Sequence, residues 1–452
     1  MSERQFAAIV LAAGIGTRMK SRLAKVMHPI AGRPMIGHLL ATVATLAPAR
    51  VVVVVGPDMA AVSEAAAPAE TVVQDAPLGT GHAVLAARDA LADFDGDVVV
   101  LFGADPLIGA ATIDAALAAR HATPAPAVVV IGMRPDDRAA YARLVTDGVG
   151  GLDRIVEARD ASDDELAIAL CNAGTMVADR ARLFDLLGRV DNDNAKNEYY
   201  LTEVVALARA DGEPCGYIEA PAEELVGIDS REDLAVAEAL VQGRLRARAM
   251  AGGVTLIDPA SVHLSFDTAF GQDVVVEPNV VFGPGVRVGS DVRIRAFSHL
   301  EGAHLGDGVT VGPFARLRPG AEIAAHARIG NFVEIKNATI EAGAKVNHLS
   351  YVGDARVGAG ANVGAGTITC NYDGVKKSRT DIGAGAFIGS NTALVAPVTI
   401  GDGAVIGAGS VITRDVPGDA LALTRAPQET REGWAKRLHQ AKARADGKKR
   451  KD

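Results

Sequence analysis

The hydrophobic pattern changes once along this chain of 452 residues. Up to about residue 230, short continuous apolar runs alternate with longer segments whose apolar residues recur at helical spacing. Continuous runs predict strands that are buried on both faces, as in a mostly parallel α/β sheet covered by helices. The predicted strands are residues 7–11, 51–55, 98–101 and 128–131, and the clearest helices are 34–46 and 81–91.

A helix is predicted to end this first half. Ser230 and Asp233 have the spacing of an N-terminal capping pair, and apolar residues follow at helical intervals. We therefore interpret residues 1–230 as one domain, 231–250 as a linker helix, 251–435 as a second domain and 436–452 as a basic tail.

Beyond the linker, aliphatic residues recur every six positions, a period that no α-helix has. Many are followed by Gly, which permits tight turns, and this pattern accounts for the 49 glycines. Such repeats predict a parallel β-helix, in which each coil buries its aliphatic residues against its neighbours. Interruptions near Phe297, at 352–357 and at 369–377 predict projecting loops. The periodic residues are Val274, Val280, Val286 and Val292; Leu305, Val311, Leu317, Ile323, Ile329 and Ile335; and Ile382, Ile388, Leu394, Ile400, Ile406 and Ile412.

Composition narrows the class of protein. A net charge of −9 disfavours a nucleic-acid binder, which usually carries a basic surplus. Cys171, Cys215 and Cys370 lack metal-site spacing and are odd in number, so we expect neither zinc nor a disulfide framework, and a cytoplasmic location fits best. The N-terminus does not resemble a signal peptide, and no stretch is long enough to span a membrane.

A glycine-rich turn follows the first predicted strand. It reads Leu11-Ala12-Ala13-Gly14-Ile15-Gly16-Thr17-Arg18-Met19, with Lys25 shortly after. Backbone N–H groups in such a turn can approach a phosphate, and nearby cations neutralise its charge. Gly-x-Gly alone also fits a plain strand–helix turn, and neither the dinucleotide fingerprint nor the P-loop spacing is present.

The complete string resembles the signature loop of sugar-phosphate nucleotidyltransferases. This resemblance implies UTP and sugar contacts from Leu11, Ala12, Ala13, Gly14, Arg18, Lys25 and Gly103. It also implies that Gln74, Gly79 and Thr80 read the base, and that Ala142, Glu157, Asn172 and the segment 197–202 form the sugar pocket.

In the reaction that the resemblance implies, an oxygen of a sugar 1-phosphate attacks the α-phosphorus of UTP and pyrophosphate leaves. It needs alignment and charge neutralisation more than a protein nucleophile. Mg²⁺ would need only one or two carboxylates besides phosphate oxygens, and our candidates are Asp105 and Asp229. Asp105 is displaced by one position from the family's aspartate, which would reverse its direction in a regular strand but not necessarily at a strand end. Asp229 replaces a family Asn, and Ala142 replaces a family Gly.

Polar residues gather in the second half at 316–320, 331–336, 347–351 and 371–374. Stacked coils would bring them together. Arg318 and Lys336 can hold a phosphate, and His348 can take a proton from an amine that attacks a thioester. A lone His is more often structural, but this one lies among other polar residues, and Glu334 is a candidate to orient it or to receive substrate protons.

Over nearly the whole chain these strings resemble the bifunctional N-acetylglucosamine-1-phosphate uridylyltransferase/glucosamine-1-phosphate acetyltransferase family. The implied fold is α/β: a Rossmann-like nucleotidyltransferase sheet followed by a left-handed parallel β-helix of hexapeptide repeats, assembled as a homotrimer. The resemblance implies His348 as general base, and glucosamine 1-phosphate contacts from Arg318, Lys336, Tyr351 and Asn362. It implies acetyl-CoA contacts from Ala365, Asn371, Tyr372, Ser390, Ala408 and Arg425.

The expected function is therefore acetylation of glucosamine 1-phosphate, followed by uridylyl transfer to N-acetylglucosamine 1-phosphate, giving UDP-N-acetylglucosamine for peptidoglycan and lipopolysaccharide precursors. Two alternatives remain at this stage. One is a nucleotidyltransferase with a single activity and a structural or regulatory β-helix. The other is a binding subunit that has lost its metal site.

Overall fold

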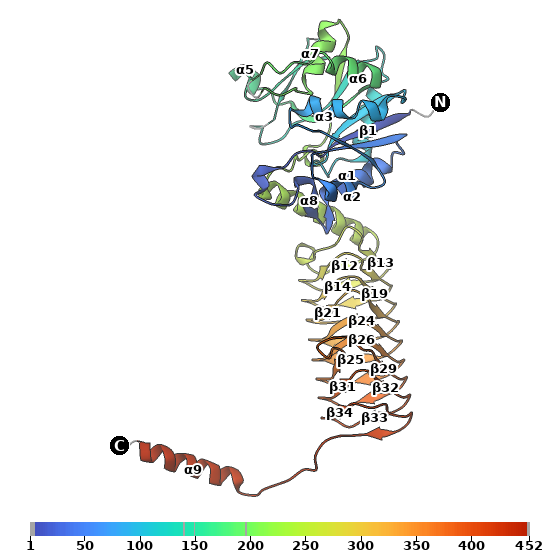
Figure 1. Ribbon diagram of the computed structural model, residues 1–452, viewed down its shortest axis with the longest axis vertical. Helices are drawn as coiled ribbons and strands as arrows, with labels where there is room; N and C mark the ends of the chain where they lie inside the picture. Colours follow the sequence, from blue (N-terminus) through green and yellow to red (C-terminus); the bar gives the residue numbers. More distant parts are fainter. Residues whose placement is uncertain (1–4, 139–140, 149, 195–196, 450–452) are drawn as a thin grey trace. The chain divides into compact units, whose positions relative to one another are not determined.

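The computed structural model describes residues 5–138, 141–148, 150–194 and 197–449. The chain forms two compact units. Met1–Ala251 and His263–Thr268 form the first, and Gly252–Val262 and Ala269–Asp452 form the second (Figure 1). Helix α8 (Arg231–Ala251) closes the main part of the first unit. It begins at reciprocal hydrogen bonds: Asp233 N–H donates to Ser230 Oγ at 3.2 Å, and Ser230 N–H donates to Asp233 Oδ2 at 2.8 Å.

The first unit is built on a mixed sheet in the order β11-β7-β10-β6-β1-β4-β5. Strand β1 pairs in parallel with β4 and β6, whereas β10 runs antiparallel between β6 and β7. The predicted strands are confirmed with small extensions. The bounds are β1 (Phe6–Leu11), β4 (Arg50–Val55), β5 (Glu70–Val73), β6 (Asp97–Phe102), β7 (Val128–Met133), β8 (Arg143–Thr146), β9 (Leu152–Val156), β10 (Cys171–Asp179) and β11 (Cys215–Glu219).

Helices cover both faces of this sheet, which explains the continuous apolar strands. Along β1, Ala7 and Ile9 pack into one core, and Ala8 and Val10 pack into the other. The first core contains α3 (Thr80–Ala86), α6 (Arg180–Leu187) and α7 (Glu203–Ala210). The second contains α1 (Met35–Ala44), α2 (Ala60–Ala66) and α4 (Ala110–Ala119). The helix predicted over 81–91 is shorter, because α3 ends at Ala86 and a separate 3₁₀ turn, η3 (Asp89–Leu91), follows.

The second unit is a left-handed parallel β-helix of stacked coils (Figure 1). Equivalent residues on most successive coils lie 17 or 18 positions apart, as in the pairings of Val275 with Arg293 and of Arg293 with Thr310. The spacing rises to 25 across residues 371–378, as between Asn362 and Phe387. The six-residue aliphatic positions are buried, which confirms the predicted core. One sheet contains β12 (Thr255–Leu256), β14 (Val275–Val276), β17 (Arg293–Ile294), β20 (Thr310–Val311), β23 (Arg328–Asn331), β25 (Lys345–His348), β27 (Asn362–Val363), β30 (Phe387–Ile388), β33 (Val405–Ile406) and β35 (Leu421–Ala422). The other contains β13 (Ala269–Phe270), β15 (Val281–Phe282), β16 (Arg287–Val288), β18 (His299–Leu300), β19 (Ala303–Leu305), β21 (Arg316–Leu317), β22 (Ala321–Ile323), β24 (Glu334–Ile340), β26 (Tyr351–Val357), β28 (Ile368–Cys370), β29 (Thr380–Ile382), β31 (Ala393–Val395), β32 (Val398–Ile400) and β34 (Val411–Ile412).

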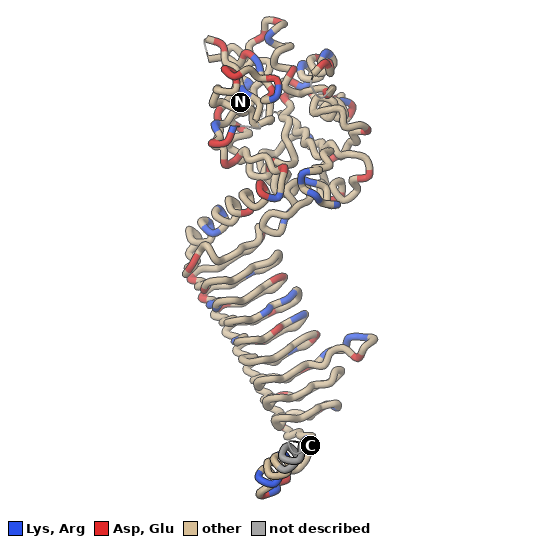
Figure 2. Tube along the Cα trace, turned by 90° about the vertical axis from the view of Figure 1, so that its left-hand side faces the viewer, with Lys and Arg blue, Asp and Glu red and all other residues tan. Residues whose placement is uncertain are grey.

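Only one of the three predicted interruptions produces a projecting loop. Residues 371–378 leave the coil, and Tyr372 and Lys377 form an antiparallel bridge within this loop, which carries both signs of charge (Figure 2). The predictions at 352–357 and near Phe297 are wrong. Strand β26 continues through Val357, and Asp354 at φ 48° provides a bend without an insertion. Phe297 occupies a coil corner at φ 60°.

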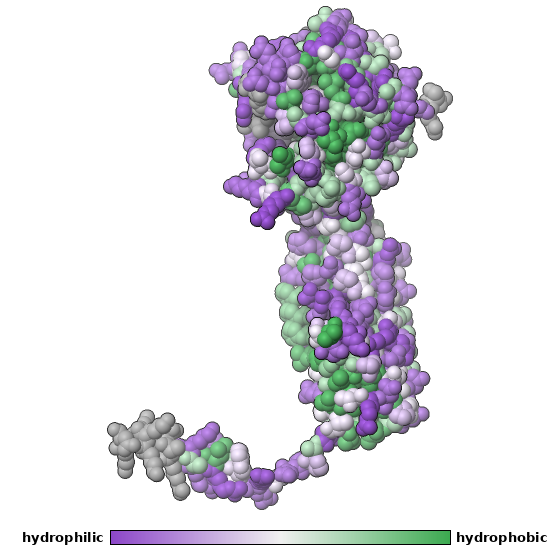
Figure 3. All heavy atoms as spheres, viewed as in Figure 1, coloured by the Kyte–Doolittle hydropathy of each residue, from purple (hydrophilic) through white to green (hydrophobic). Residues whose placement is uncertain are grey.

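Phe297 begins a column of exposed apolar side chains at this corner. Its ring stacks on Phe314 with centroids 5.0 Å apart, and Phe314 stacks on Phe332 at 5.1 Å. Leu349 occupies the same corner one coil further on, since its N–H bonds to Asn331 O. The four side chains are 45–60% exposed, and Figure 3 shows apolar residues at the surface of the stacked coils. We call Phe297, Phe314, Phe332 and Leu349 the corner ladder.

The C-terminal segment is helical. Helix α9 (Trp434–Lys449) begins where the basic tail was predicted, and most of its described side chains up to Ala443 are exposed. Within the described residues, no helix combines the length and apolar character needed to cross a membrane.

The close stacking of coils predicts a specific cost for a single methyl group. At Gly358, a Cβ would overlap the backbone N of Ala384 and the backbone C of Gly383 on the next coil. Gly358→Ala should therefore destabilise the β-helix by about 2 kcal/mol or more, measured by calorimetry of the full chain. Gly243→Ala is the control, because a Cβ there meets nothing within 4 Å. Equal unfolding temperatures for the two variants would contradict this packing.

Candidate active sites

The first candidate site lies where the order of the sheet reverses. Strand β1 lies between β4 and β6, so the loop after β1 opens at the carboxyl edge of the sheet, where α/β sheets bind ligands. Ala12 N–H bonds to Val54 O at 2.8 Å, and Gly103 N–H bonds to Leu11 O at 2.9 Å. Gln74 directly follows β5 at the same edge. The topology thereby gathers the signature loop, Gly103 and Gln74.

The signature loop is tightly folded. Gly16 has φ 70°, and a Cβ there would lie 2.6 Å from Lys25 Cβ, so only glycine fits. The loop leads into η1 (Thr17–Met19) and η2 (Lys25–Met27), two three-residue 3₁₀ helices, rather than into an α-helix as the turn predicted. The cations of these short helices, rather than a long helix dipole, must therefore neutralise most of a phosphate's charge.

Two of these cations hold Asp229. Lys25 Nζ lies 2.8 Å from Asp229 Oδ1, and Arg18 Nη2 lies 2.9 Å from Asp229 Oδ2. Ile228 N–H bonds to Ala104 O at 3.1 Å, so the segments that carry Asp105 and Asp229 are joined through their backbones. Asp105 follows the end of β6, and its N–H bonds to Phe102 O at 2.9 Å. This turn leaves the displaced aspartate close enough to interact electrostatically with Lys25 and Asp229.

Asp105 has an unusual protonation equilibrium. Burial raises the pKa of its carboxyl to about 7; Lys25 opposes the rise and Asp229 adds to it. A divalent cation would favour the ionised form. Among the described residues, no group of three or more His, Cys, Asp or Glu side chains could hold a metal by itself. Two carboxylates next to a triphosphate would nevertheless suit Mg²⁺, which retains water and phosphate ligands.

Arg231 is a residue that we did not single out from the sequence. Its Nε donates to Met19 O at 3.2 Å and its Nη1 to His28 Nδ1 at 3.3 Å, so it links both 3₁₀ helices to α8. Burial lowers the pKa of His28, as does Arg231 to a smaller extent, and the neutral ring can accept the guanidinium hydrogen. The only sequence signal was its place two residues after Asp229.

The predicted base and sugar segments also meet. Tyr199 N–H bonds to Leu78 O at 2.8 Å, and Leu201 N–H bonds to Thr80 Oγ1 at 3.0 Å. Thr202 Oγ1 donates to Glu157 Oε1 at 3.3 Å. Further along, Asn172 N–H bonds to Ala142 O at 2.8 Å, so the family Gly position retains a backbone hydrogen bond with Ala in place.

The second candidate site surrounds His348 in the β-helix. His348 Nδ1 lies 2.7 Å from Asn331 Oδ1 on the preceding coil. With that oxygen as acceptor, Nδ1 carries the hydrogen and Nε2 keeps a lone pair. The sequence suggested Glu334 as the orienting group, and this is wrong: Glu334 Oε1 pairs with Arg318 Nη1 at 2.8 Å. Asn331 is the residue that orients the imidazole.

Three of the predicted sugar-phosphate residues share one face. Arg318 lies beside Lys336, because its N–H bonds to Ile335 O, and Tyr351 pairs in register with Glu334. Glu334 raises the pKa of Arg318, chiefly through their hydrogen bond. Buried Asn371 donates to Tyr351 OH at 3.4 Å and also bonds to Asp354. These contacts join Asn371 to the same face.

Asn362 lies elsewhere. It pairs in register with Lys345 in the other sheet of the β-helix, so it does not join Arg318, Lys336 and Tyr351 within one chain. Tyr372 projects with the 371–378 loop, where its hydroxyl donates to Gly374 O at 2.6 Å.

A column of small residues continues from His348 along the coil axis. Gly366 N–H bonds to His348 O, Asn391 N–H to Ala365 O, and Gly409 N–H to Ser390 O. Ala365, Ser390 and Ala408 therefore occupy the position of His348 on successive coils. Arg425 Nη1 donates to Ala408 O at 2.8 Å and marks the end of the column. With coils about 4.8 Å apart, the column is roughly 15 Å long. The coils thus assemble into one strip five predicted acetyl-CoA or catalytic residues that lie far apart in sequence.

Together, the phosphate-type loop and the hexapeptide coil define a two-domain transferase. Residues 8–198 match the MobA-like NTP transferase domain, and residues 302–337 and 379–414 match the bacterial transferase hexapeptide (six repeats). The chain belongs to the GlmU family. It is 61% identical to the bifunctional protein GlmU of Paramagnetospirillum magneticum over 99% of this chain and 100% of that protein.

Two further relatives support this assignment. The bifunctional protein GlmU of Rhodospirillum rubrum is 58% identical, and that of Azorhizobium caulinodans is 56% identical, each over 98% of this chain and 99% of the relative. A solved UDP-glucose pyrophosphorylase complexed with UDP-glucose is similar with a TM-score of 0.45 and 15% identity, covering 53% of this chain and 99% of its own. Relatives described as bifunctional over the full length argue against the two alternatives left by the sequence.

The buried carboxyl at the first site generates a pH prediction. Because the pKa of Asp105 rises from 3.8 to about 7 on folding, the folded state binds the proton more tightly, and stability is lost as pH rises through this range. Without divalent metal, the free energy of unfolding of Asp105→Asn, relative to that of the parent chain, should therefore increase by roughly 2 kcal/mol as the pH is raised from 5 to 8. Hydrogen exchange of β6, corrected for intrinsic rates, measures the first unit alone. If the stabilities of the parent and of Asp105→Asn changed with pH in parallel, the raised pKa of Asp105 would be contradicted.

Proposed function

We propose that this chain makes UDP-N-acetylglucosamine in two steps, with acetyl transfer in the β-helix and uridylyl transfer in the α/β unit. Membership of the bifunctional GlmU family supports both activities. The observation that carries the assignment of the acetyl site is the strip from His348 to Arg425, because a scaffold would have no need of it.

In the acetyl-transfer step, the amine of glucosamine 1-phosphate attacks the carbonyl carbon of acetyl-CoA. His348 Nε2 removes a proton from this nitrogen as the C–N bond forms, and the C–S bond then breaks to release CoA, whose sulfur takes up a proton. Asn331 keeps Nε2 available by binding Nδ1. Arg318 and Lys336 hold the sugar phosphate, while Tyr351 and Asn371 line the acceptor pocket. The acetyl-CoA arm follows Ala365, Ser390 and Ala408 toward Arg425, and Tyr372 contributes from its loop.

In the uridylyl-transfer step, a phosphate oxygen of N-acetylglucosamine 1-phosphate attacks the α-phosphorus of UTP, and pyrophosphate leaves. Lys25 and Arg18 neutralise phosphate charge, since they already bind the carboxylate of Asp229. Asp105 and Asp229 would hold Mg²⁺, which neutralises the triphosphate when bound. The backbone from Leu11 to Gly14 and Gly103 surround the nucleotide, Gln74, Gly79 and Thr80 read the base, and Ala142, Glu157 and Asn172 bind the sugar.

We further propose a homotrimer with the acetyl site completed by a neighbouring copy. Two observations support it. The corner ladder exposes stacked aromatic rings next to His348, and contiguous exposed apolar surface usually marks an interface. Asn362 lies in a different sheet from the other sugar-phosphate residues, so it would serve a neighbour's site. Free cysteines at Cys171, Cys215 and Cys370 agree with a reducing cytoplasm.

Separate sites predict separable losses. His348→Ala should lower acetyl transfer at least about 100-fold and leave pyrophosphate release from UTP unchanged. Asp105→Ala should do the reverse. Each activity is the other's folding control in the same full-length protein. Equal loss of both activities in either variant would contradict separate sites, and full uridylyl transfer by Asp105→Ala would exclude Asp105 as a metal ligand.

The corner ladder predicts the oligomeric state. Phe314→Glu places a charge between two stacked rings and should convert trimers to monomers in sedimentation experiments, because burying an unpaired carboxylate is costly. Acetyl transfer should fall with the trimer, while uridylyl transfer persists. Leu166→Glu is the matched control, since it alters another exposed apolar residue in the first unit. A trimeric Phe314→Glu variant would rule out the ladder as the interface.

A further inference from the structure

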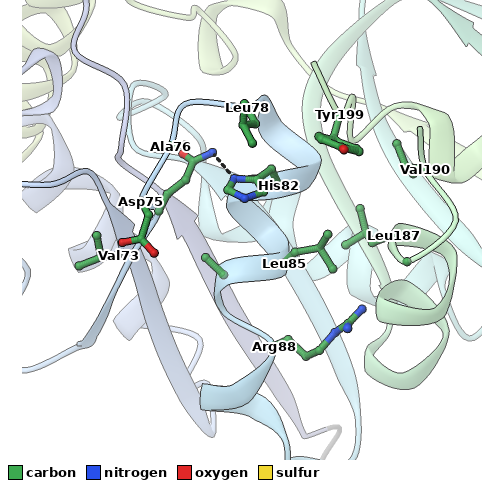
Figure 4. A pocket seen from close by; sticks show the side chains of 13 residues that line it. Val73, Asp75, Ala76, Leu78, His82, Leu85, Arg88, Leu187, Val190 and Tyr199 are labelled. Carbon is green, nitrogen blue, oxygen red and sulfur yellow. Dashed lines mark hydrogen bonds between the residues drawn. The ribbon is translucent and has the colours of Figure 1, made fainter. Parts of the chain in front are cut away.

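A second opening lies beside the predicted base-reading residues. It is a cavity of about 650 Å³ lined by Gln74 and His82 among others, and Figure 4 shows the His82 ring and the hydrogen bond at its Nδ1, whose partner is Gln74. Leu78 and Tyr199 lie on one side, and Leu85 and Leu187 lie below. The signature loop does not line this cavity. Gln74 and His82, by contrast, both line it.

The orientation of the Gln74 amide follows from its partners. Gln74 is only 6% exposed. Its Nε2 lies 3.1 Å from Gly79 O and 3.1 Å from His82 Nδ1. A carbonyl oxygen can only accept a hydrogen bond, so the amide edge that faces Gly79 must be the NH₂ group. The assignment of nitrogen and oxygen is thus forced by chemistry.

The same NH₂ group determines the state of His82. Both hydrogens of Gln74 Nε2 are donated, one to Gly79 O and one to His82 Nδ1, so Nδ1 must be an acceptor and the ring hydrogen is on Nε2. Among the described residues, Gln74 Oε1 has no hydrogen-bond partner. The side chain therefore presents an acceptor, and not a donor, to a bound base.

Both acceptors are held in place. Gly79 has φ 109°, and a Cβ there would lie 2.6 Å from Tyr199 O, so its peptide is pressed against the 197–202 segment. His82 lies in α3, and its ring lies 6.4 Å from the ring of Tyr199. The amide of Gln74 consequently cannot turn over without losing both hydrogen bonds.

We propose that His82 is a positioning residue that makes the uridylyl site select uracil over cytosine. Uracil carries a hydrogen on N3, which Gln74 Oε1 can accept, whereas N3 of cytosine carries only a lone pair. Without the acceptor at His82 Nδ1, only the hydrogen bond to Gly79 O still holds the amide, so turning it to offer NH₂ to cytosine costs one hydrogen bond instead of two. In the parent chain, the fixed amide places the acceptor Gln74 Oε1 against the lone pair on N3 of cytosine, and this mismatch disfavours CTP. This inference rests on the proposed uridylyl transfer.

The test compares two variants of His82 in the full-length protein. His82→Phe keeps an aromatic ring against Tyr199 and Leu85 but removes the acceptor. His82→Asn is smaller and keeps an acceptor oxygen near the position of Nδ1. The ratio of kcat/KM for UTP to that for CTP is measured by pyrophosphate release with N-acetylglucosamine 1-phosphate, and acetyl transfer reports folding.

We expect the ratio to fall at least about tenfold in His82→Phe, corresponding to one hydrogen bond, and to be retained in His82→Asn. A ratio in His82→Phe equal to that of the parent overturns the proposal, even if kcat falls. A purely structural role of His82 would lower kcat/KM for UTP and for CTP by the same factor. If His82→Phe releases no pyrophosphate, calorimetric affinities for UTP and CTP provide the same ratio. A parent chain inactive with UTP would instead refute the proposed function itself.

Discussion

The backbone hydrogen bonds between successive coils are the constraint on which the second unit depends. They fix equivalent residues of neighbouring coils side by side, at most coils 17 or 18 positions apart, so the chemistry of one position is repeated or altered on the next coil. Gly358, packed against Ala384 and Gly383, shows how little freedom this stacking leaves. A strip of small side chains can then extend from His348 to Arg425 without any residue having to be brought there by a separate loop.

The α/β unit holds its candidate site residues in place in a different way. Its candidate site residues come from loops at the carboxyl edge of parallel strands, and hydrogen bonds between the loops hold them in place. Ile228 and Ala104 join the two acidic segments through a backbone hydrogen bond, while Arg231 ties the 3₁₀ helices to α8. The first unit thus positions its charged side chains by hydrogen bonds between loops, whereas the second positions its site residues by the regular pairing of successive coils.

Much of this architecture was predictable because periodicity reports burial directly. Strand positions such as 98–101 and the six-residue aliphatics have one dominant environment, and the resemblance to known motifs supplied the candidate site residues. What failed depends on geometry that spacing does not encode. Glu334 lies in β24, in a different sheet from His348 in β25, and its carboxylate pairs with Arg318, whereas Asn331 orients the ring from the coil before. Likewise, a residue in the left-handed backbone conformation, such as Asp354, bends the chain without an insertion. An interruption of the six-residue pattern therefore need not indicate a projecting loop.

If the register of the coils aligns the residues that bind acetyl-CoA within one chain, a crystal structure of the full chain with acetyl-CoA tests this most directly. The pantetheine arm should lie along Ala365, Ser390 and Ala408, with the thioester beside His348 Nε2 and a phosphate of CoA at Arg425. A cofactor bound on another face of the coils, with its thioester remote from the imidazole, would contradict this explanation.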